Sequence, residues 1–243
     1  MAEIRELKRP KGLLFDKDGT MFDYHRTWTP LLTEVAERLA VGDRRKVQAM
    51  LAAIGHDAES GRFLSGSIAA AGDTFALADV WLRHLDGADR AALIATLDAH
   101  FAEEGPKRSI PVADLAALFG RLKANGFILG IATNDVEASA LGTVERFRLG
   151  AHVDFVAGYD SGHGQKPGPG MALAFCDAVK LMPVEIAVIG DNSHDLEMGR
   201  RAGAGLGIGV LTGTSARDDL APLADHVIES IELLPPLLDS FES

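Results

Sequence analysis

The feature that most limits the fold of this chain is a series of short apolar runs that alternate with longer helical patterns. The runs are residues 12–15, 127–132, 153–157, 185–189, 206–211 and 226–228. Most are apolar at nearly every position, as expected for strands that are covered on both faces of a sheet. Helical patterns at residues 111–124, 135–148, 167–181 and 193–202 lie between them. This alternation predicts an α/β fold with a doubly wound, mostly parallel sheet.

Residues 22–105 interrupt the alternation. A crossover between parallel strands needs only about a dozen residues or slightly more, and this stretch is several times longer. Its patterns are helical, and a helical segment of this size needs a small core of its own. We therefore predict an inserted all-helical domain at residues 22–105, with residues 1–21 and 106–243 forming the sheet core.

Local signals suggest where the helices of this insert begin and end. Thr29 followed by Pro30 is typical of an N-cap and the first position of a helix, and Asp43 is expected to cap the next helix. Further helical patterns cover residues 73–85 and 88–104. Gly105-Pro106 is expected to form the hinge through which the chain returns to the core.

Charge and cysteine content exclude several classes of protein. The chain has 243 residues and a formal net charge of −11, which disfavours nucleic acid and anionic membranes as partners. Its single cysteine, Cys176, excludes a disulfide framework and a cysteine-rich zinc site. Residues 1–11 lack an apolar signal core, and no window is apolar enough to span a bilayer. A cytoplasmic location is therefore expected.

The first apolar run ends at two aspartates, Asp16 and Asp18, followed by Gly19. The carboxyl ends of strands in open α/β sheets are where ligands bind. An Asp-x-Asp pattern on an extended backbone points both carboxylates to the same side. Two acids so close repel each other unless a cation or a shared proton lies between them, so this pattern indicates a divalent-metal or acid/base site.

Other polar residues are predicted at the same edge of the sheet. The run at residues 127–132 ends in Thr133-Asn134, where a hydroxyl precedes the free N–H groups of a helix and can hold an anion. Lys166 precedes a helix start, and the run at residues 185–189 leads to Asp191, with Asp195 four residues later. Each residue alone has an ordinary structural explanation as a turn, cap or solvated residue, but their joint order indicates a site for metal and phosphate.

In this order and spacing the chain resembles the haloacid dehalogenase superfamily. The matching motifs are Asp16-Lys17-Asp18-Gly19-Thr20, Thr133-Asn134, Lys166-Pro167 and Gly190-Asp191-Asn192-Ser193-His194-Asp195. They cover residues 11–21 and about 106–230. The resemblance implies a Rossmann-like core, and the helical insert resembles the cap domain of phosphoglycolate-phosphatase-like members.

The resemblance also implies roles for these residues. Asp16 would be the nucleophile and Asp18 the acid/base. The Asp16 carboxylate, the Asp18 backbone carbonyl and Asp191 would hold Mg²⁺, with Asp195 in a supporting position. The phosphoryl oxygens would be bound by Thr133, the Asn134 backbone and Lys166. This implies a Mg²⁺-dependent phosphatase that acts on a small metabolite, such as a phosphoglycolate-like compound or a sugar phosphate, through an aspartyl-phosphate intermediate.

One residue of the first motif departs from the pattern of the superfamily. Lys17 stands where an apolar residue is common, and by strand alternation we expect it to point away from Asp16 and Asp18 without affecting the chemistry. In the helical insert, Tyr24, His25 and Arg26 lie close in sequence to the first motif and are candidates for contact with the leaving group.

Two alternatives to the phosphatase remain open. One is a phosphomutase of the same superfamily, and the other is a non-catalytic phosphate-binding module, which would be expected to lack one of the key acids or Lys166. A dehalogenase is disfavoured because it has no use for Asp18 as an acid/base. A phosphonatase is expected to use a lysine of the insert as a Schiff base. It is disfavoured because the only lysine at residues 22–105 is Lys46, an ordinary residue on a helix face. The sequence leaves the substrate and the oligomeric state open.

Overall fold

The structure, a computed structural model, describes residues 8–241. Its centre is a six-stranded sheet in the order β5-β4-β1-β6-β7-β8, in which every neighbouring pair is parallel. The strands are β1 (Gly12–Phe15), β4 (Ile128–Ala132), β5 (Phe155–Ala157), β6 (Ile186–Gly190), β7 (Leu206–Val210) and β8 (His226–Ile228). All six strands that the apolar runs predict are therefore present, with ends that shift by up to two residues.

Helices cover both faces of this sheet. They are α6 (Leu115–Ala124), α7 (Glu137–Arg146), α8 (Gly170–Val179), α9 (Ser193–Ala202), α10 (Arg217–Leu220) and α11 (Leu234–Asp239). On one face, Phe119 of α6 and Leu238 of α11 pack with Phe15 of β1. On the other face, Phe175 of α8 packs with Leu14 of the same strand. Neighbouring residues of β1 are thus buried on opposite faces, which confirms the doubly wound α/β fold.

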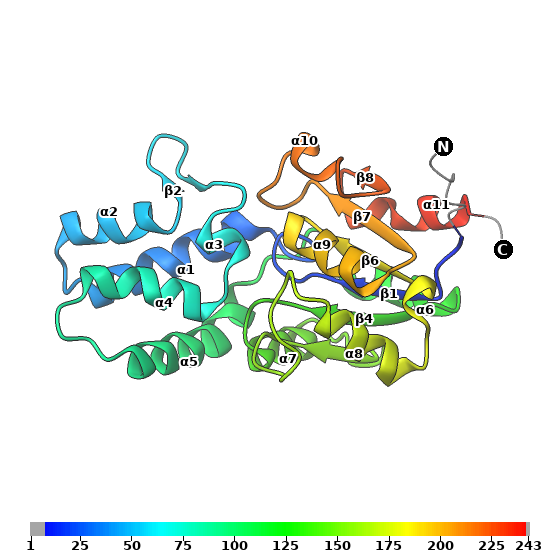
Figure 1. Ribbon diagram of the computed structural model, residues 1–243, viewed down its shortest axis with the longest axis horizontal. Coiled ribbons are helices and arrows are strands. Elements are labelled where there is room, and N and C mark those ends of the chain that lie inside the picture. The colour runs from blue at the N-terminus through cyan, green and yellow to red at the C-terminus, as the bar shows by residue number, and fades with distance from the viewer. Residues whose placement is uncertain (1–7, 242–243) are drawn as a thin grey trace.

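The segment between β1 and β4 contains α1 (Tyr24–Leu39), α2 (Arg44–Ala53), α3 (Ile68–Ala71), α4 (Thr74–Trp81) and α5 (Arg90–Arg108). These helices lie together at one end of the molecule, beside the sheet (Figure 1). They enclose a hydrophobic core of their own, in which Leu31, Met50 and Trp81 are fully buried. Residues 22–105 are called the helical insert below.

The insert differs from the sequence-based expectation in its strands and its first helix. It contains a two-stranded antiparallel pair, β2 (His56–Asp57) and β3 (Arg62–Phe63), which is too short to give a periodic pattern. Helix α1 begins before Thr29 and Pro30, because Asp23 caps it by accepting a hydrogen bond from the Arg26 N–H at 2.9 Å. Burial of Tyr24 and Trp28 supports the added turn, so the predicted start of this helix was wrong.

The predicted hinge at Gly105-Pro106 lies within helix α5, which continues to Arg108. Both residues serve the packing of α5 on α7. A Cβ atom on Gly105 would lie 2.8 Å from the Ser139 hydroxyl, and one on Gly142 would lie 2.8 Å from the Pro106 ring. The glycines permit a close helix crossing, and α5 joins the insert to the core without a break.

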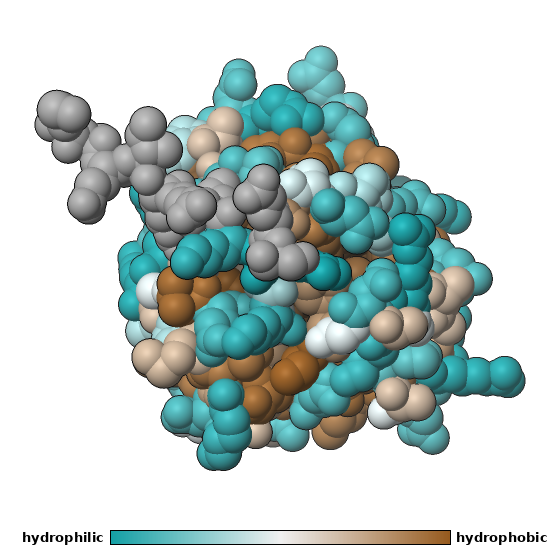
Figure 2. All heavy atoms as spheres, turned by 90° about the vertical axis from the view of Figure 1, so that its right-hand side faces the viewer, coloured by the Kyte–Doolittle hydropathy of each residue, from teal (hydrophilic) through white to brown (hydrophobic). Residues whose placement is uncertain are grey.

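Within residues 8–241, no helix is both long and apolar enough to cross a bilayer. Figure 2 shows hydrophilic and hydrophobic residues interspersed on the end of the sheet core that lies away from the helical insert.

Candidate active site

The predicted site residues meet at one edge of the sheet because they follow strands that are neighbours. Asp16 follows β1, Thr133 follows β4 and Asp191 follows β6, and β1 lies between the other two strands. The Asp16 N–H donates to the Ile189 carbonyl at 2.8 Å, which continues the pairing of β1 with β6. Gly19 then turns the chain with a φ of 99°, a conformation that few residues other than glycine adopt.

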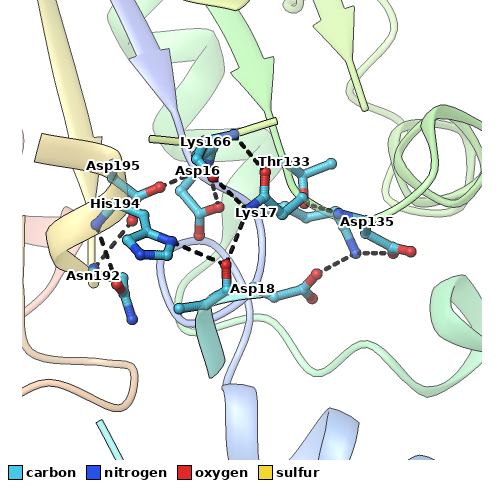
Figure 3. A network of polar contacts seen from close by, with 11 residues as sticks. Asp16, Lys17, Asp18, Thr133, Asp135, Lys166, Asn192, His194 and Asp195 are labelled. Carbon is cyan, nitrogen blue, oxygen red and sulfur yellow. Dashed lines mark hydrogen bonds and ion pairs between the residues drawn. The ribbon is translucent and has the colours of Figure 1, made fainter. Parts of the chain in front are cut away.

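Lys166 joins two of the acids at the centre of this edge (Figure 3). Its Nζ atom lies 2.6 Å from Asp16 Oδ1 and 2.6 Å from Asp195 Oδ1, and all three side chains are buried. Burial raises the pKa of Asp16 to about 6, although the Lys166 cation lowers it. The other oxygen of the carboxylate, Asp16 Oδ2, is buried and has no hydrogen-bond partner. It is the oxygen left free to meet a metal ion or a phosphorus atom.

Asp16, Asp191 and Asp195 form a cluster that fits a divalent cation. Each offers a carboxylate oxygen, and these oxygens all lie within 4.8 Å of one another. Burial raises the pKa of Asp191 well above its usual range, and the charges of Asp16 and Asp195 raise it further. Lys166 supplies only one positive charge to these carboxylates. A bound cation would offset their repulsion, so the donor set and its charge suit a divalent cation that prefers oxygen ligands.

Backbone groups hold the other two acids of the cluster in place. Asp195 Oδ2 accepts a hydrogen bond from the Asn192 N–H at 3.0 Å, at the start of α9. Asp191 Oδ2 accepts one from the Thr214 N–H at 3.0 Å. The loop that carries Thr214 passes very close, since a Cβ atom on Gly213 would lie 1.8 Å from Asp191 Oδ2. No local sequence pattern marks this loop as part of the site, because only the pairing of β7 beside β6 brings it there.

Lys17 contradicts the expectation that it points away from the acids. Its Nζ atom lies 2.6 Å from Asp18 Oδ2 and 2.9 Å from Asp135 Oδ2, and its side chain is 1% exposed. It also lies 5.6 Å from the centre of the Trp28 ring. The backbone turns after Asp16, so strand alternation no longer applies, and the lysine meets Asp18 in the turn (Figure 3).

The Asp18 carboxyl is thereby held by a buried cation. Burial raises the pKa of Asp18, whereas the Lys17 cation lowers it. The two carboxylates in turn raise the pKa of Lys17 above its usual range, so the lysine stays charged. Asp18 Oδ1 is buried without a hydrogen-bond partner. One oxygen of Asp18 is therefore fixed by Lys17 and the other is free to exchange a proton.

Thr133 and Asn134 lie at the same edge and contact the surrounding backbone. Thr133 Oγ1 accepts a hydrogen bond from the Asp135 N–H at 3.1 Å. The Asn134 side chain accepts one from the Lys166 N–H at 2.8 Å and donates one to the Ala71 carbonyl at 2.9 Å. The latter contact crosses from the core to the helical insert. His194 Nδ1 lies 3.1 Å from the same Ala71 carbonyl, so two residues of the core hold this end of α3 over the site.

Two hollows open at Asp16 and Asp18. The smaller one, of about 250 Å³, is lined by Lys166, Asp191 and Asp195. The larger one, of about 580 Å³ including the part open to solvent, extends between the core and the helical insert. Tyr24 lines the larger hollow as its sequence position suggests, whereas His25 and Arg26 do not. The site thus has a charged side for phosphate and metal and a separate side for the rest of a substrate.

Comparison with known proteins agrees with this geometry. The profile of haloacid dehalogenase-like hydrolases matches residues 10–203. The chain belongs to the haloacid dehalogenase-like hydrolase family. The match begins just before β1 and ends after α9, so it includes all of the acids and both lysines described above.

Curated proteins that this chain resembles include phosphoglycolate phosphatases. That of Mesorhizobium japonicum is 27% identical, with 79% of this chain and 78% of that protein covered. That of Rhodospirillum rubrum is 29% identical, with 80% and 77% covered. Other matches are partial, such as the Salmonella typhimurium phosphoglycolate phosphatase at 25% identity, of which 42% is covered. The chain is thus similar to the phosphoglycolate-phosphatase-like subfamily.

Solved structures share the fold. A haloacid dehalogenase phosphatase from Thermococcus onnurineus has a TM-score of 0.63 at 19% identity, with 96% of this chain and 100% of that chain covered. A protein from Haemophilus somnus described as a "predicted phosphoglycolate phosphatase" has a TM-score of 0.72 at 16% identity, with 95% and 99% covered. The likeness spans nearly the whole of both chains, and the helical insert is included.

Proposed function

We propose that this hydrolase is a Mg²⁺-dependent phosphatase that cleaves phosphate monoesters of small metabolites through an aspartyl phosphate on Asp16. The observation that carries this proposal is the pair of free oxygens, Asp16 Oδ2 and Asp18 Oδ1. Both oxygens are buried, and the other oxygen of each carboxylate is held by its own lysine. Two carboxyls fixed side by side with one free oxygen each suit a nucleophile and its acid/base partner.

In the first step, the free oxygen of Asp16 forms a bond to phosphorus as the bond to the leaving oxygen breaks. Asp18 enters this step protonated and gives its proton to the leaving oxygen, which departs as an alcohol. In the second step, water attacks the phosphorus of the aspartyl phosphate while the Asp18 carboxylate takes a proton from it. Inorganic phosphate leaves, and both carboxyls return to their initial states.

The other residues of the site bind and orient the substrate in this proposal. Lys166 lies beside Asp16 and offsets repulsion between the nucleophile and an anionic phosphoryl group. Thr133 and the Asn134 backbone bind phosphoryl oxygens. The Asp16 carboxylate, the Asp18 backbone carbonyl and Asp191 would hold Mg²⁺, which would neutralise charge where the phosphoryl group binds. Asp195, which contacts Lys166, supports this arrangement.

The helical insert acts as a cap that shields the reaction from water. The Ala71 carbonyl of α3 contacts Asn134 and His194 of the core, so the insert already lies against the site. A cap of this kind excludes bulk water from the aspartyl phosphate and adds the contacts that select a substrate.

The test measures release of inorganic phosphate from an aryl phosphate such as p-nitrophenyl phosphate. We expect activity that requires Mg²⁺ and that falls at least about a thousandfold in Asp16→Asn, because the amide is not a nucleophile. Asp86→Asn, at an exposed position of the insert, serves as the matched control and should keep full activity. Activity that survives either chelation of the metal or Asp16→Asn would refute the proposal. Transfer of phosphate to a second hydroxyl, without release, would indicate the phosphomutase instead.

A further inference from the structure

The larger hollow is the place where the part of the substrate beyond the phosphoryl group would bind. It begins at Asp16 and Asp18 and extends into the helical insert, so a leaving group bonded at the site would occupy it. Much of its wall is apolar or aromatic. The large residues of this kind are Tyr24, Trp28, Leu32, Ile68, Leu77 and Phe101.

The charged residues of this wall are all acids. They are Asp16, Asp18, Asp73 and Asp135, and no Lys, Arg or His is among the described residues that line the hollow. Lys17 lies behind the wall with a side-chain exposure of 1%, and its charge faces Asp18 and Asp135. Asp73 forms no ion pair among the pairs found in residues 8–241. Lys17 compensates Asp18 and Asp135, and Lys166 compensates Asp16, so Asp73 carries the uncompensated charge of this wall. A second negative charge on the substrate would be repelled by Asp73 and would meet no cation among the residues that line the hollow.

Two buried polar atoms of this wall have no partner. Asp73 and Trp28 are each 7% exposed. Asp73 Oδ2 and Trp28 Nε1 both lack a hydrogen bond within the described chain. A buried polar group without a partner costs free energy, so both atoms are suited to pair with a ligand. The carboxylate oxygen accepts a hydrogen bond from a hydroxyl or ammonium group, and the indole N–H donates one to an oxygen.

The N-terminus of α4 also faces this region, and such a terminus could attract an anion. Asp73 already occupies that position, because its Oδ1 accepts a hydrogen bond from the Ala76 N–H at 2.8 Å as the N-cap of α4. The capping carboxylate offsets the positive end of the helix. The helix terminus therefore does not reverse the negative character of the wall.

We propose that the leaving group is an alcohol that carries further hydrogen-bond donors and no negative charge, such as a polyol or an amino alcohol. The inference rests on the proposed phosphatase function. It separates this chain from the phosphoglycolate phosphatases that it resembles, since glycolate would bring a carboxylate into a wall of acids. Asp73 is the specificity-determining residue, and Trp28 assists it with a single donor.

The first experiment compares three phosphate monoesters of similar size with the full-length wild-type enzyme in Mg²⁺. They are glycerol 3-phosphate, 2-aminoethyl phosphate and phosphoglycolate. We expect kcat/KM for the better of the first two to exceed that for phosphoglycolate by about tenfold or more, because like charges brought together in a site strongly disfavour the wrong ligand. A higher kcat/KM for glycerol 3-phosphate would indicate hydroxyl donors, and a higher value for 2-aminoethyl phosphate would indicate an ammonium donor.

The second experiment repeats the comparison with Asp73→Asn, which keeps an N-cap but loses the negative charge. We expect kcat/KM to rise for phosphoglycolate and to fall for the donor-bearing ester, and a merely damaged fold cannot cause changes of opposite sign. Asp89→Asn is the matched control, because Asp89 caps α5 with the same 2.8 Å geometry away from the hollow. If Asp73→Asn does not fold, Trp28→Phe supplies the test through a lower kcat/KM for glycerol 3-phosphate.

The proposal is overturned if the wild-type enzyme has its highest kcat/KM for phosphoglycolate, or if the kcat/KM values for the three esters agree within about threefold. It is also overturned if the enzyme hydrolyses none of the three esters while it hydrolyses the aryl phosphate. Equal losses for all three esters in the Asp73 variant would also overturn it. Absence of Asp16-dependent hydrolysis of the aryl phosphate refutes the phosphatase itself, so the two failures are distinguishable.

Discussion

Replacement of Lys17 by methionine tests how far this buried lysine stabilises the site. Methionine keeps much of the length of the side chain but removes the cation that lies 2.6 Å from Asp18 Oδ2 and 2.9 Å from Asp135 Oδ2. The two carboxylates then remain buried without a positive partner. The variant is therefore expected to lose stability mainly through the acids that it leaves behind.

The expected size follows from the burial of this cluster. Removing one partner of a buried ion pair destabilises a protein by about 3–5 kcal/mol, because the remaining charge stays desolvated. For a chain of this size, that loss lowers the melting temperature by about 6–20 °C. The matched control is Lys123→Met, since Lys123 forms an ion pair with Asp154 in which the side chains are 29% and 36% exposed. A pair of that kind contributes at most about 1 kcal/mol.

The loss also depends on pH in a defined direction. The pKa of Lys17 is raised in the fold, so its stabilising contribution is complete below the usual lysine range and persists at pH 8. The pKa of Asp18, already raised by burial, rises further when the lysine is removed. The folded variant then binds protons more readily than the unfolded chain and gains stability as the pH falls. The deficit relative to the wild type is thus expected to be larger at pH 8 than at pH 5.

The assay is urea unfolding of wild type, Lys17→Met and Lys123→Met at pH 8 and pH 5, with the free energy of unfolding obtained at each pH. The double variant Lys17→Met/Asp135→Asn removes one of the two acids left without a cation, and it should recover part of the lost free energy of unfolding. A Lys17 variant within 1 kcal/mol of the wild type at pH 8, or a deficit that grows at pH 5, would refute this reasoning.

Three further predictions concern the metal, the core of the insert and the nucleophile. Gly213→Ala should weaken Mg²⁺ binding in calorimetry by at least about tenfold, because its Cβ would displace Asp191, whereas Gly150→Ala, with open space around it, should not. Trp81→Ala removes a fully buried ring from the core of the helical insert and should cost about 3–5 kcal/mol in chemical unfolding; a smaller loss than about 1 kcal/mol would contradict the packing. Asp16 must be ionised to attack, and its pKa of about 6 predicts that kcat/KM falls as the pH drops through 6. Bound Mg²⁺ moves this acidic limb to lower pH, and an acidic limb above pH 7 would contradict the assignment.

Some site residues could be found from the sequence because strand order brings them together. Asp16, Thr133 and Asp191 each follow an apolar run, and parallel strands place such residues at one edge. Lys166 is in the predicted place, with its Nζ 2.6 Å from Asp16. The roles of these residues in catalysis stay predictions, since they rest on the resemblance to the superfamily and on geometry.

Other residues depend on contacts that no local pattern records. Lys17 was expected to point away from the acids, and the turn after Asp16 instead brings it to Asp18. The loop with Gly213 and Thr214 reaches Asp191 only because β7 pairs beside β6. The polar atoms of Asp73 and Trp28 come to one wall through helix packing in the insert. These positions are fixed by the packing of segments far apart in the chain.

The sequence by itself determined the alternation of buried strands and helices, and with it the fold and the edge on which the acids gather. Apolar periodicity is a local property, and parallel pairing converts strand ends into a common edge. Only the tertiary structure decided the partners of each charge. A side chain's protonation and hydrogen bonding depend on neighbours within a few ångströms, whatever their distance along the chain. The gathering of the acids and Lys166 at one edge was therefore predictable from motifs, whereas the pairing of Lys17 with Asp18 and the acidic wall of the larger hollow were not.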